Sequence, residues 1–108
     1  MSLIVLVSVR FSPEHMDKVR PLLKQMAIDT NKQDGCLLYA ASEDVGVPGT
    51  VRFTEHWRDT EALLKHLDDP GLEPWRKLSA ELGAFDRNAK LYDASGERPL
   101  ASIRGSKA

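Results

Sequence analysis

Residues 3–13 of this chain read LIVLVSVRFSP and contain its strongest secondary-structure signals. Residues 3–11 are rich in Val, Ile and Leu and contain no Gly or Pro, which predicts a buried β-strand. Ser12 and Pro13 favour the start of a helix, because a serine hydroxyl accepts hydrogen bonds from free backbone N–H groups and proline suits the first helical position. A strand that passes directly into a helix is therefore expected.

The helix is expected to continue well beyond Pro13, because side chains suited to a buried face recur there at helical spacing. They are Met16, Val19, Leu22, Leu23, Met26, Ala27 and Thr30. Pro21 lies inside this segment and can kink the helix, since proline removes one backbone hydrogen bond. Gly35 is expected to end the helix, because glycine adopts positive φ without strain.

Two further strands are expected after this helix. Residues 36–42 form the first and residues 50–57 the second, and residues 43–49 between them have the Asp, Gly and Pro content of a turn. Along residues 50–57 the side chains alternate between the two faces of the sheet. One of these faces carries Val51, Phe53, Glu55 and Trp57.

The remaining chain predicts two short helices and a last strand. Asp59 can cap a helix that runs to about residue 67, where Asp-Pro-Gly soon breaks the pattern. A third helix is expected over residues 72–82 and a fourth strand over residues 84–93. We place one domain at residues 1–94 and expect residues 95–108 to form a flexible C-terminal tail.

This order of elements predicts an α+β, ferredoxin-like fold, the split βαβ arrangement with a four-stranded antiparallel sheet. Its helices would cover only one face of the sheet. The strands are nevertheless apolar on both faces, above all residues 3–9, and an uncovered apolar face needs a partner. We therefore expect a homodimer in which two sheets pack face to face.

The composition favours one small domain that binds neither nucleic acid nor a membrane. A chain of 108 residues matches one domain, and its formal net charge of −1 leaves no basic excess for phosphates. Cys36 is the single cysteine, which excludes an internal disulfide and a thiolate metal cluster. The apolar N-terminal run is too short to span a membrane and lacks the features of a signal peptide. A cytoplasmic location is therefore expected.

Three groups of residues carry a resemblance to a known family: residues 35–39 (GCLLY), residues 55–59 (EHWRD), and Ala62-Leu63 followed by His66. They resemble the antibiotic biosynthesis monooxygenase family of quinol-monooxygenase-like proteins. In that family a Gly-Cys or Gly-small pair opens the second strand, a Glu-x-Trp closes the third, and an Ala-Leu and a His lie on the next helix. The resemblance covers roughly residues 3–93.

The resemblance implies a dimeric α/β barrel with a cavity in each subunit, between the helices and the sheet. The best-understood members oxidise electron-rich aromatics, such as anthrones and quinols, with O₂ and without a metal, flavin or haem cofactor. Other relatives on this fold degrade haem, isomerise a phosphorylated sugar or have no known substrate. The fold alone therefore does not define the function.

Oxidation without a cofactor needs only a few protein groups. Triplet O₂ reacts slowly with closed-shell molecules, but a substrate that forms a stable carbanion or phenolate can donate an electron itself. The protein then supplies a group that promotes deprotonation, donors that hold the oxyanion, and a dry cavity. The catalytic candidates are His66, Trp57 and Glu55, with Arg52 as a further donor. The expected substrate-binding wall consists of Tyr39, Phe53, Leu63 and Trp75.

Each catalytic candidate also has a structural interpretation. The indole N–H of Trp57 can donate to a substrate oxygen, or its ring can anchor the core. His66 can take a proton near neutral pH, or it can tie its helix to the sheet. Glu55 shares a face with apolar residues, where a carboxylate is costly without a partner. That partner can be His66, as part of a catalytic pair or of a structural bridge, or it can be an arginine.

Metal and haem chemistry are not expected. His15, His56 and His66 include no pair with zinc-ligand spacing on one element. The haem-degrading relatives use an asparagine on the first strand and a histidine ligand on the later helix. Neither is found at the corresponding positions, where Trp75 has no histidine beside it.

Two other functions stay open at this level. An isomerase of a small phosphorylated carbohydrate would need a cationic phosphate grip, for which Lys65, Lys90 and Arg87 are available. A non-catalytic dimer that binds a small ligand is the other alternative. A cavity filled by side chains would favour it, as would Glu55 and His66 bonded to each other and cut off from any cavity.

Overall fold

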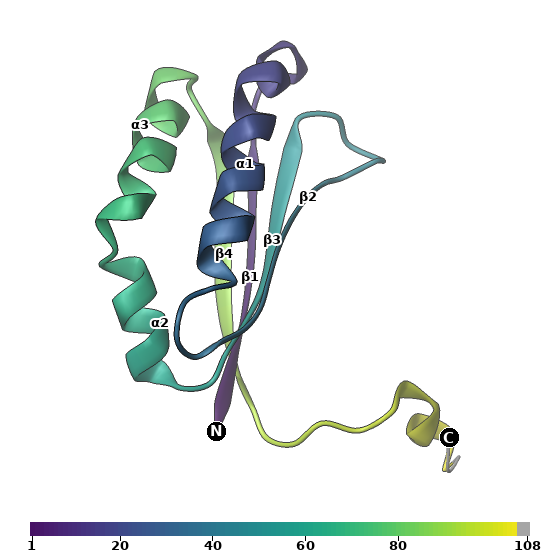
Figure 1. The fold of residues 1–108 in the computed structure, drawn as a ribbon. Helices are drawn as coiled ribbons and strands as arrows, with labels where there is room; N and C mark the ends of the chain where they lie inside the picture. The colour runs from purple at the N-terminus through teal and green to yellow at the C-terminus, as the bar shows by residue number, and fades with distance from the viewer. Residues whose placement is uncertain (106–108) are drawn as a thin grey trace.

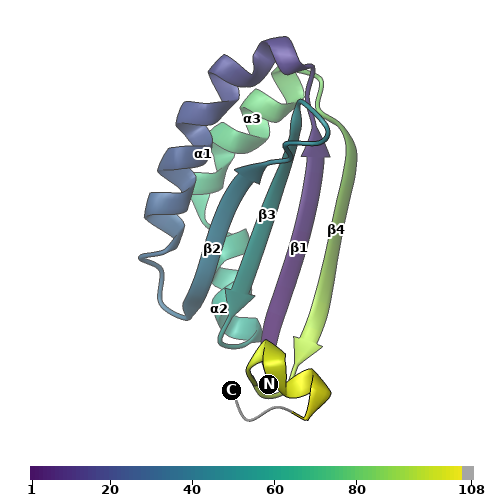
Figure 2. The same ribbon diagram turned by 90° about the vertical axis from the view of Figure 1, so that its right-hand side faces the viewer.

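The computed structural model of this chain describes residues 1–105. Strands β1 (Ser2–Arg10), β2 (Cys36–Glu43), β3 (Thr50–Trp57) and β4 (Phe85–Ala94) form one antiparallel sheet in the order β2-β3-β1-β4. Helices α1 (Met16–Thr30), α2 (Thr60–Leu67) and α3 (Glu73–Glu81) cover one face of it (Figures 1 and 2). Short 3₁₀ turns occur at Pro13–His15, Pro70–Leu72 and Leu100–Arg104. This is the predicted ferredoxin-like α+β fold.

The hydrophobic core lies between the helices and the covered face of the sheet. Trp57, Val19 and Val51 are fully buried in it. Burial of one large apolar side chain contributes about 1.5–3 kcal/mol before entropy is counted. The alternation predicted for β3 is confirmed, since its odd-numbered residues are all buried in the core.

The opposite face of the sheet carries no helix within residues 1–105 (Figure 2). Strand pairing places Leu38, His56, Ile4 and Tyr92 in one row across it, and Leu6 in the next row. Leu6, Leu38 and Tyr92 are 43%, 46% and 49% exposed. These five residues define what we call the open face, and they show that the strands carry apolar side chains on both sides, as predicted.

The end of α1 differs from the prediction. The helix ends at Thr30 and not at Gly35. The Asn31 side-chain amide stops it by donating to Ala27 O at 2.7 Å and to Tyr39 O at 2.8 Å. Because one of these acceptors lies on β2, a contact between distant segments sets the end of the helix.

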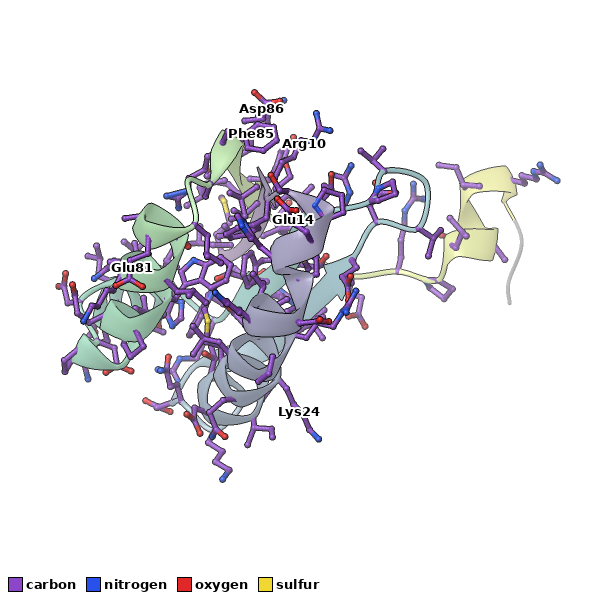
Figure 3. All side chains as sticks on the ribbon, turned by 90° about the horizontal axis from the view of Figure 1, so that it is seen from above. Arg10, Glu14, Lys24, Glu81, Phe85 and Asp86 are labelled. Carbon is purple, nitrogen blue, oxygen red and sulfur yellow. The ribbon has the colours of Figure 1, made fainter. Side chains whose placement is uncertain are left out.

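The ends of β1 and β4 meet in an irregular corner, seen at one end of the molecule in Figure 3. The register shifts between Ser8 and Arg10, and Asp86 has a φ of 51°. The Arg10 guanidinium lies 5.2 Å from the centre of the Phe85 ring and 3.4 Å from the Asp86 carboxylate. Ser12, predicted to cap the following helix, makes no side-chain capping hydrogen bond within the described chain.

The C-terminal segment extends beyond the end of the sheet (Figure 1). Its 3₁₀ turn exposes Leu100 and Ile103, at 89% and 67%. The predicted tail also includes residues 106–108, which lie outside the described residues. Between residues 1 and 105, no helix combines the length and the apolar character that crossing a bilayer requires.

Gly35 is a position where one added methyl group is expected to destabilise the fold. Its φ of 82° lies in the left-handed region, and a Cβ there would clash with the Cβ of Ala62 on α2. Gly35→Ala should therefore lower the free energy of unfolding by about 2–4 kcal/mol, through backbone strain and overpacking. Urea denaturation measures this loss.

Gly83→Ala is the matched control for that substitution. Gly83 also has a positive φ, of 69°, but a Cβ there meets no atom within 4 Å. Only the backbone cost of about 1 kcal/mol is expected. Equal losses in the two variants would show that the clash with Ala62 contributes nothing.

Candidate active site

A cavity of about 460 Å³ lies between the sheet and helices α2 and α3. Its size and its largely apolar lining are typical of small-molecule sites. Two of the predicted catalytic side chains, Glu55 and His66, face into it from β3 and α2. They are only 6% and 4% exposed, so the polar end of the cavity lies deep in the protein.

The predicted substrate-binding residues come together in this cavity. Tyr39, Phe53, Leu63 and Trp75 all line it. The Phe53 ring centre lies 5.4 Å from that of Trp75, at 81°, and 5.8 Å from that of Tyr39. Such tilted and edge-to-face contacts are favourable for aromatic pairs. The structure therefore builds an aromatic wall from three separate elements.

Strand pairing places Glu55 under this wall. Tyr39 pairs with Glu55, Glu55 pairs with Val5, and Val5 pairs with Leu91, which forms one row across all four strands. All four side chains line the cavity. Glu55 is therefore the one acidic side chain in this row of four.

The indole of Trp57 holds Glu55 in place. Its Nε1–H donates to Glu55 Oε1 at 3.0 Å, and the ring is fully buried. The indole N–H of Trp57, which was predicted to donate to a substrate oxygen, thus donates to Glu55. Trp57 packs 4.7 Å from the His66 ring but is not among the described residues that line the cavity.

A loop residue that the sequence did not single out orients His66. The Nδ1 atom of His66 lies 3.0 Å from Oε1 of Gln33, and Nε2 of Gln33 donates to Oδ2 of Asp69 at 2.9 Å. A carboxylate only accepts, so this network points the Gln33 amide nitrogen at Asp69 and its oxygen at His66. Neutral His66 therefore carries its proton on Nδ1 and keeps a free lone pair on Nε2.

The lone pair on Nε2 faces Glu55 across a gap. Nε2 of His66 and Oε1 of Glu55 are 4.0 Å apart, too far for a hydrogen bond. A ligand hydroxyl placed in this gap could donate its proton to Nε2 of His66. Glu55 and His66 are thus neither bonded to each other nor cut off from the cavity.

Burial shifts the pKa values of Glu55 and His66 in opposite directions, because it disfavours the charged form of each. It raises the pKa of Glu55, although the Trp57 hydrogen bond and the nearby Arg87 charge oppose the rise. It lowers the pKa of His66, although Asp69 opposes the fall. A neutral imidazole near neutral pH is the state that can accept a proton from a ligand.

Arg52 does not belong to this site. Its guanidinium binds Asp44 at 2.9 and 3.0 Å in the β2–β3 hairpin. His56 also points away, with Nε2 2.8 Å from Ser2 Oγ. Both residues lie on the uncovered side of the sheet, since the side chains of β3 alternate.

Cationic side chains line the outer part of the cavity. Of the three predicted as a phosphate grip, Arg87 lines it and Lys65 does not, while Arg76 on α3 also contributes. Lys90 borders the cavity, but it pairs with Leu6, so its side chain points to the open face. No group of three His, Cys, Asp or Glu side chains in residues 1–105 is arranged to hold a metal ion. Arg76 and Gln33 had no recognisable signal in the sequence, because nothing local indicates which way they point.

The chain matches the family model "antibiotic biosynthesis monooxygenase" over residues 2–78. A crystal structure of a candidate antibiotic biosynthesis monooxygenase from Deinococcus radiodurans is 34% identical, with a TM-score of 0.85, over 91% of this chain and 97% of that chain. Another antibiotic biosynthesis monooxygenase is 29% identical, with a TM-score of 0.78, over 87% and 99%.

The protein Rv0793 from Mycobacterium tuberculosis has a TM-score of 0.79 over 92% of this chain and 100% of that chain. At 23% identity, this likeness shows the fold alone. No curated protein matches the chain.

Proposed function

This chain belongs to the antibiotic biosynthesis monooxygenase family, and from that premise we propose that it oxidises a quinol- or anthrone-like aromatic with O₂ and without a cofactor. The family supports a monooxygenase-like activity in general. One observation carries the finer proposal, namely a neutral, oriented base at the inner end of an aromatic cavity. That base is His66, with Glu55 beside it.

Each step of the proposed reaction uses a side chain in the cavity. Nε2 of His66 takes a proton from an acidic hydroxyl or methylene group of the substrate. Burial raises the pKa of Tyr39, so its hydroxyl stays protonated and is a donor candidate for the resulting oxyanion. Apolar walls limit the access of water to the anion. Glu55 accepts from Trp57 and stands where it can relay the proton.

Oxygen then reacts with the substrate anion itself. For an anthrone, the carbanion passes one electron to O₂, and the two radicals combine to form a carbon–oxygen bond. The peroxide takes up a proton and loses water, which leaves a ketone. One oxygen atom enters the product and the other leaves as water, and all four electrons come from the substrate.

Oxygen consumption by the metal-free protein tests this proposal directly. We expect uptake above the spontaneous rate with an anthrone or a member of a hydroquinone panel, and one mole of O₂ per mole of ketone formed from the anthrone. Labelled O₂ should place one labelled atom in that ketone. Uptake no faster than the spontaneous rate across the panel would contradict the proposed activity.

An isomerase acting on a phosphorylated carbohydrate is the second candidate. Arg76 and Arg87 supply cations at the cavity that could bind a phosphate. The aromatic wall favours a flat ring over a small sugar, so we rank this function below the oxygenase. A purely ligand-binding dimer has less support, because the cavity is not filled by side chains.

We also propose that two copies pair through the open face. Leu6, Leu38 and Tyr92 are large apolar side chains exposed in adjoining rows of a sheet. A second copy would remove this surface from water, which a small domain needs for stability. We also propose a cytoplasmic location, which the single thiol supports because it cannot form an internal disulfide.

Sedimentation velocity provides the test of the proposed dimer. The wild-type chain is expected to sediment at twice its monomer mass of 12.0 kDa. Leu6→Asp should yield monomers, because it buries a charge at the centre of the interface. Val45→Asp is the control, since Val45 is fully exposed at the hairpin tip. A monomeric wild type at micromolar concentration would refute the dimer.

A further inference from the structure

The charges around the cavity are unbalanced. Its lining includes two cationic side chains, those of Arg76 and Arg87, and a single acid, Glu55, while Lys90 pairs with Leu6 and directs its side chain to the open face. Glu55 is buried at the inner end, whereas both arginines are exposed. The chain as a whole has a formal net charge of −1, so this local excess does not follow from its composition.

Arg87 is the cation most available to a ligand. It lines the cavity, and its charge is close enough to Glu55 to oppose the rise in the pKa of that carboxyl. It forms no ion pair with an acid in the described part of the chain. Arg76, in contrast, donates to Leu67 O at 2.8 Å.

A second polar group near these cations also lacks a partner. Ser79 lines the cavity one turn after Arg76 on α3. Its buried hydroxyl has no hydrogen-bond partner among the described residues. Buried polar atoms are normally satisfied, so an unpaired hydroxyl in a cavity wall is suited to an acceptor on a ligand.

We propose that the ligand of this cavity carries an anionic group, a carboxylate or a phosphate, that Arg87 binds at the mouth. A guanidinium binds either group through two parallel hydrogen bonds. The aromatic body of the ligand would then lie against Phe53 and Trp75, with its inner end directed at His66. This inference rests on the proposed function only in placing an aromatic substrate in the cavity.

Binding measured by calorimetry without turnover tests the inference. The probes are 2-naphthol, 2-naphthoate and 2-naphthyl phosphate, which share one ring system and differ in charge. At least one of the two anions should bind about tenfold or more tightly than 2-naphthol. Arg87→Gln should remove most of that preference and leave the affinity for 2-naphthol unchanged.

Lys77→Gln is the control for the loss of one positive charge. Lys77 is exposed on α3 and does not line this cavity, so its loss should leave the preference intact. Whichever of 2-naphthoate and 2-naphthyl phosphate binds with the higher affinity identifies the anion that the site prefers. Equal affinities for the three probes, no binding of either anion, or an unchanged preference in Arg87→Gln would overturn the inference.

These outcomes are separate from those of the oxygen experiment. Protein-dependent oxygen uptake without a preference for anions would sustain the oxygenase and remove the role of Arg87. A preference for anions without any oxygen uptake would sustain the anion site and remove the oxygenase.

Discussion

Replacing His66 by alanine is expected to lower kcat/KM for oxygen uptake by about 100-fold or more. The reason is that Gln33 holds the proton on Nδ1, 3.0 Å away, which leaves Nε2 as the free base in the cavity. An oxygen electrode with the best substrate of the panel provides the measurement. His15→Ala is the control, because His15 lies in the turn before α1 and does not line the cavity.

Uptake in His66→Ala within a factor of three of the wild type would exclude His66 as the base. Gln33→Ala distinguishes the orientation of the base from its presence. It keeps the imidazole of His66 but removes the hydrogen bond that fixes the proton on Nδ1. We expect an intermediate loss in this variant. Nitrogen-15 NMR of labelled histidine should show Nδ1 protonated in the wild type and a mixture of tautomers in Gln33→Ala.

The pH dependence of His66 follows from its burial. Burial lowers the pKa of His66 from its ordinary value of 6.5, so the base form should persist below that pH. The acid limb of kcat/KM is therefore expected below 6.5, with Glu55 coupled to it. An acid limb above 6.5 would contradict this assignment.

The same shift affects stability with a defined sign. Because the unfolded chain binds a proton on His66 more readily than the folded one, this residue's contribution is complete above pH 6.5 and is lost as pH falls toward the folded pKa. Glu55 has the opposite effect. Its pKa is raised in the folded protein, so its ionisation lowers the free energy of unfolding as pH rises through that folded-state pKa. His66→Gln should consequently lose less stability than the wild type on mild acidification.

Replacing Trp57 by alanine is expected to cost about 3–5 kcal/mol of unfolding free energy, measured by urea denaturation at pH 7. Trp57 is the largest fully buried side chain, and its removal leaves a cavity that the sheet and α2 cannot close. It also removes the indole N–H that donates to buried Glu55. Small domains have about 5–15 kcal/mol in total, so this variant should be close to unfolding.

Comparing Trp57→Phe with Trp57→Ala separates the contributions of packing and of the hydrogen bond to the free energy of unfolding. Phenylalanine keeps most of the ring but not the N–H, so about 1–3 kcal/mol should be lost. The pKa of Glu55 should rise further, because the hydrogen bond that opposes the rise is gone. Trp75→Ala, at a half-buried position in the wall, should cost less than Trp57→Ala. A loss below 1 kcal/mol for Trp57→Ala would refute the anchoring role.

Local patterns predicted several elements because their causes are local. The alternation of residues 50–57 is confirmed by β3 (Thr50–Trp57), where each odd side chain enters the core. The Asp59 cap is also confirmed, since its carboxylate accepts from Ala62 N at 2.9 Å. Alternation also placed Glu55 beside Phe53, which proved to be the cavity side.

The site's chemistry depends instead on segments that meet only after folding. The Trp57 N–H donates to Glu55, while Gln33, from the loop after α1, reaches His66 on α2. Arg87 joins the cavity because β4 pairs with β1. Residue type and spacing describe what a side chain can do, but direction and partner depend on contacts between distant parts of the chain. The residue types therefore follow from the sequence alone, whereas the orientation of the base and the charge of the cavity follow from the tertiary structure.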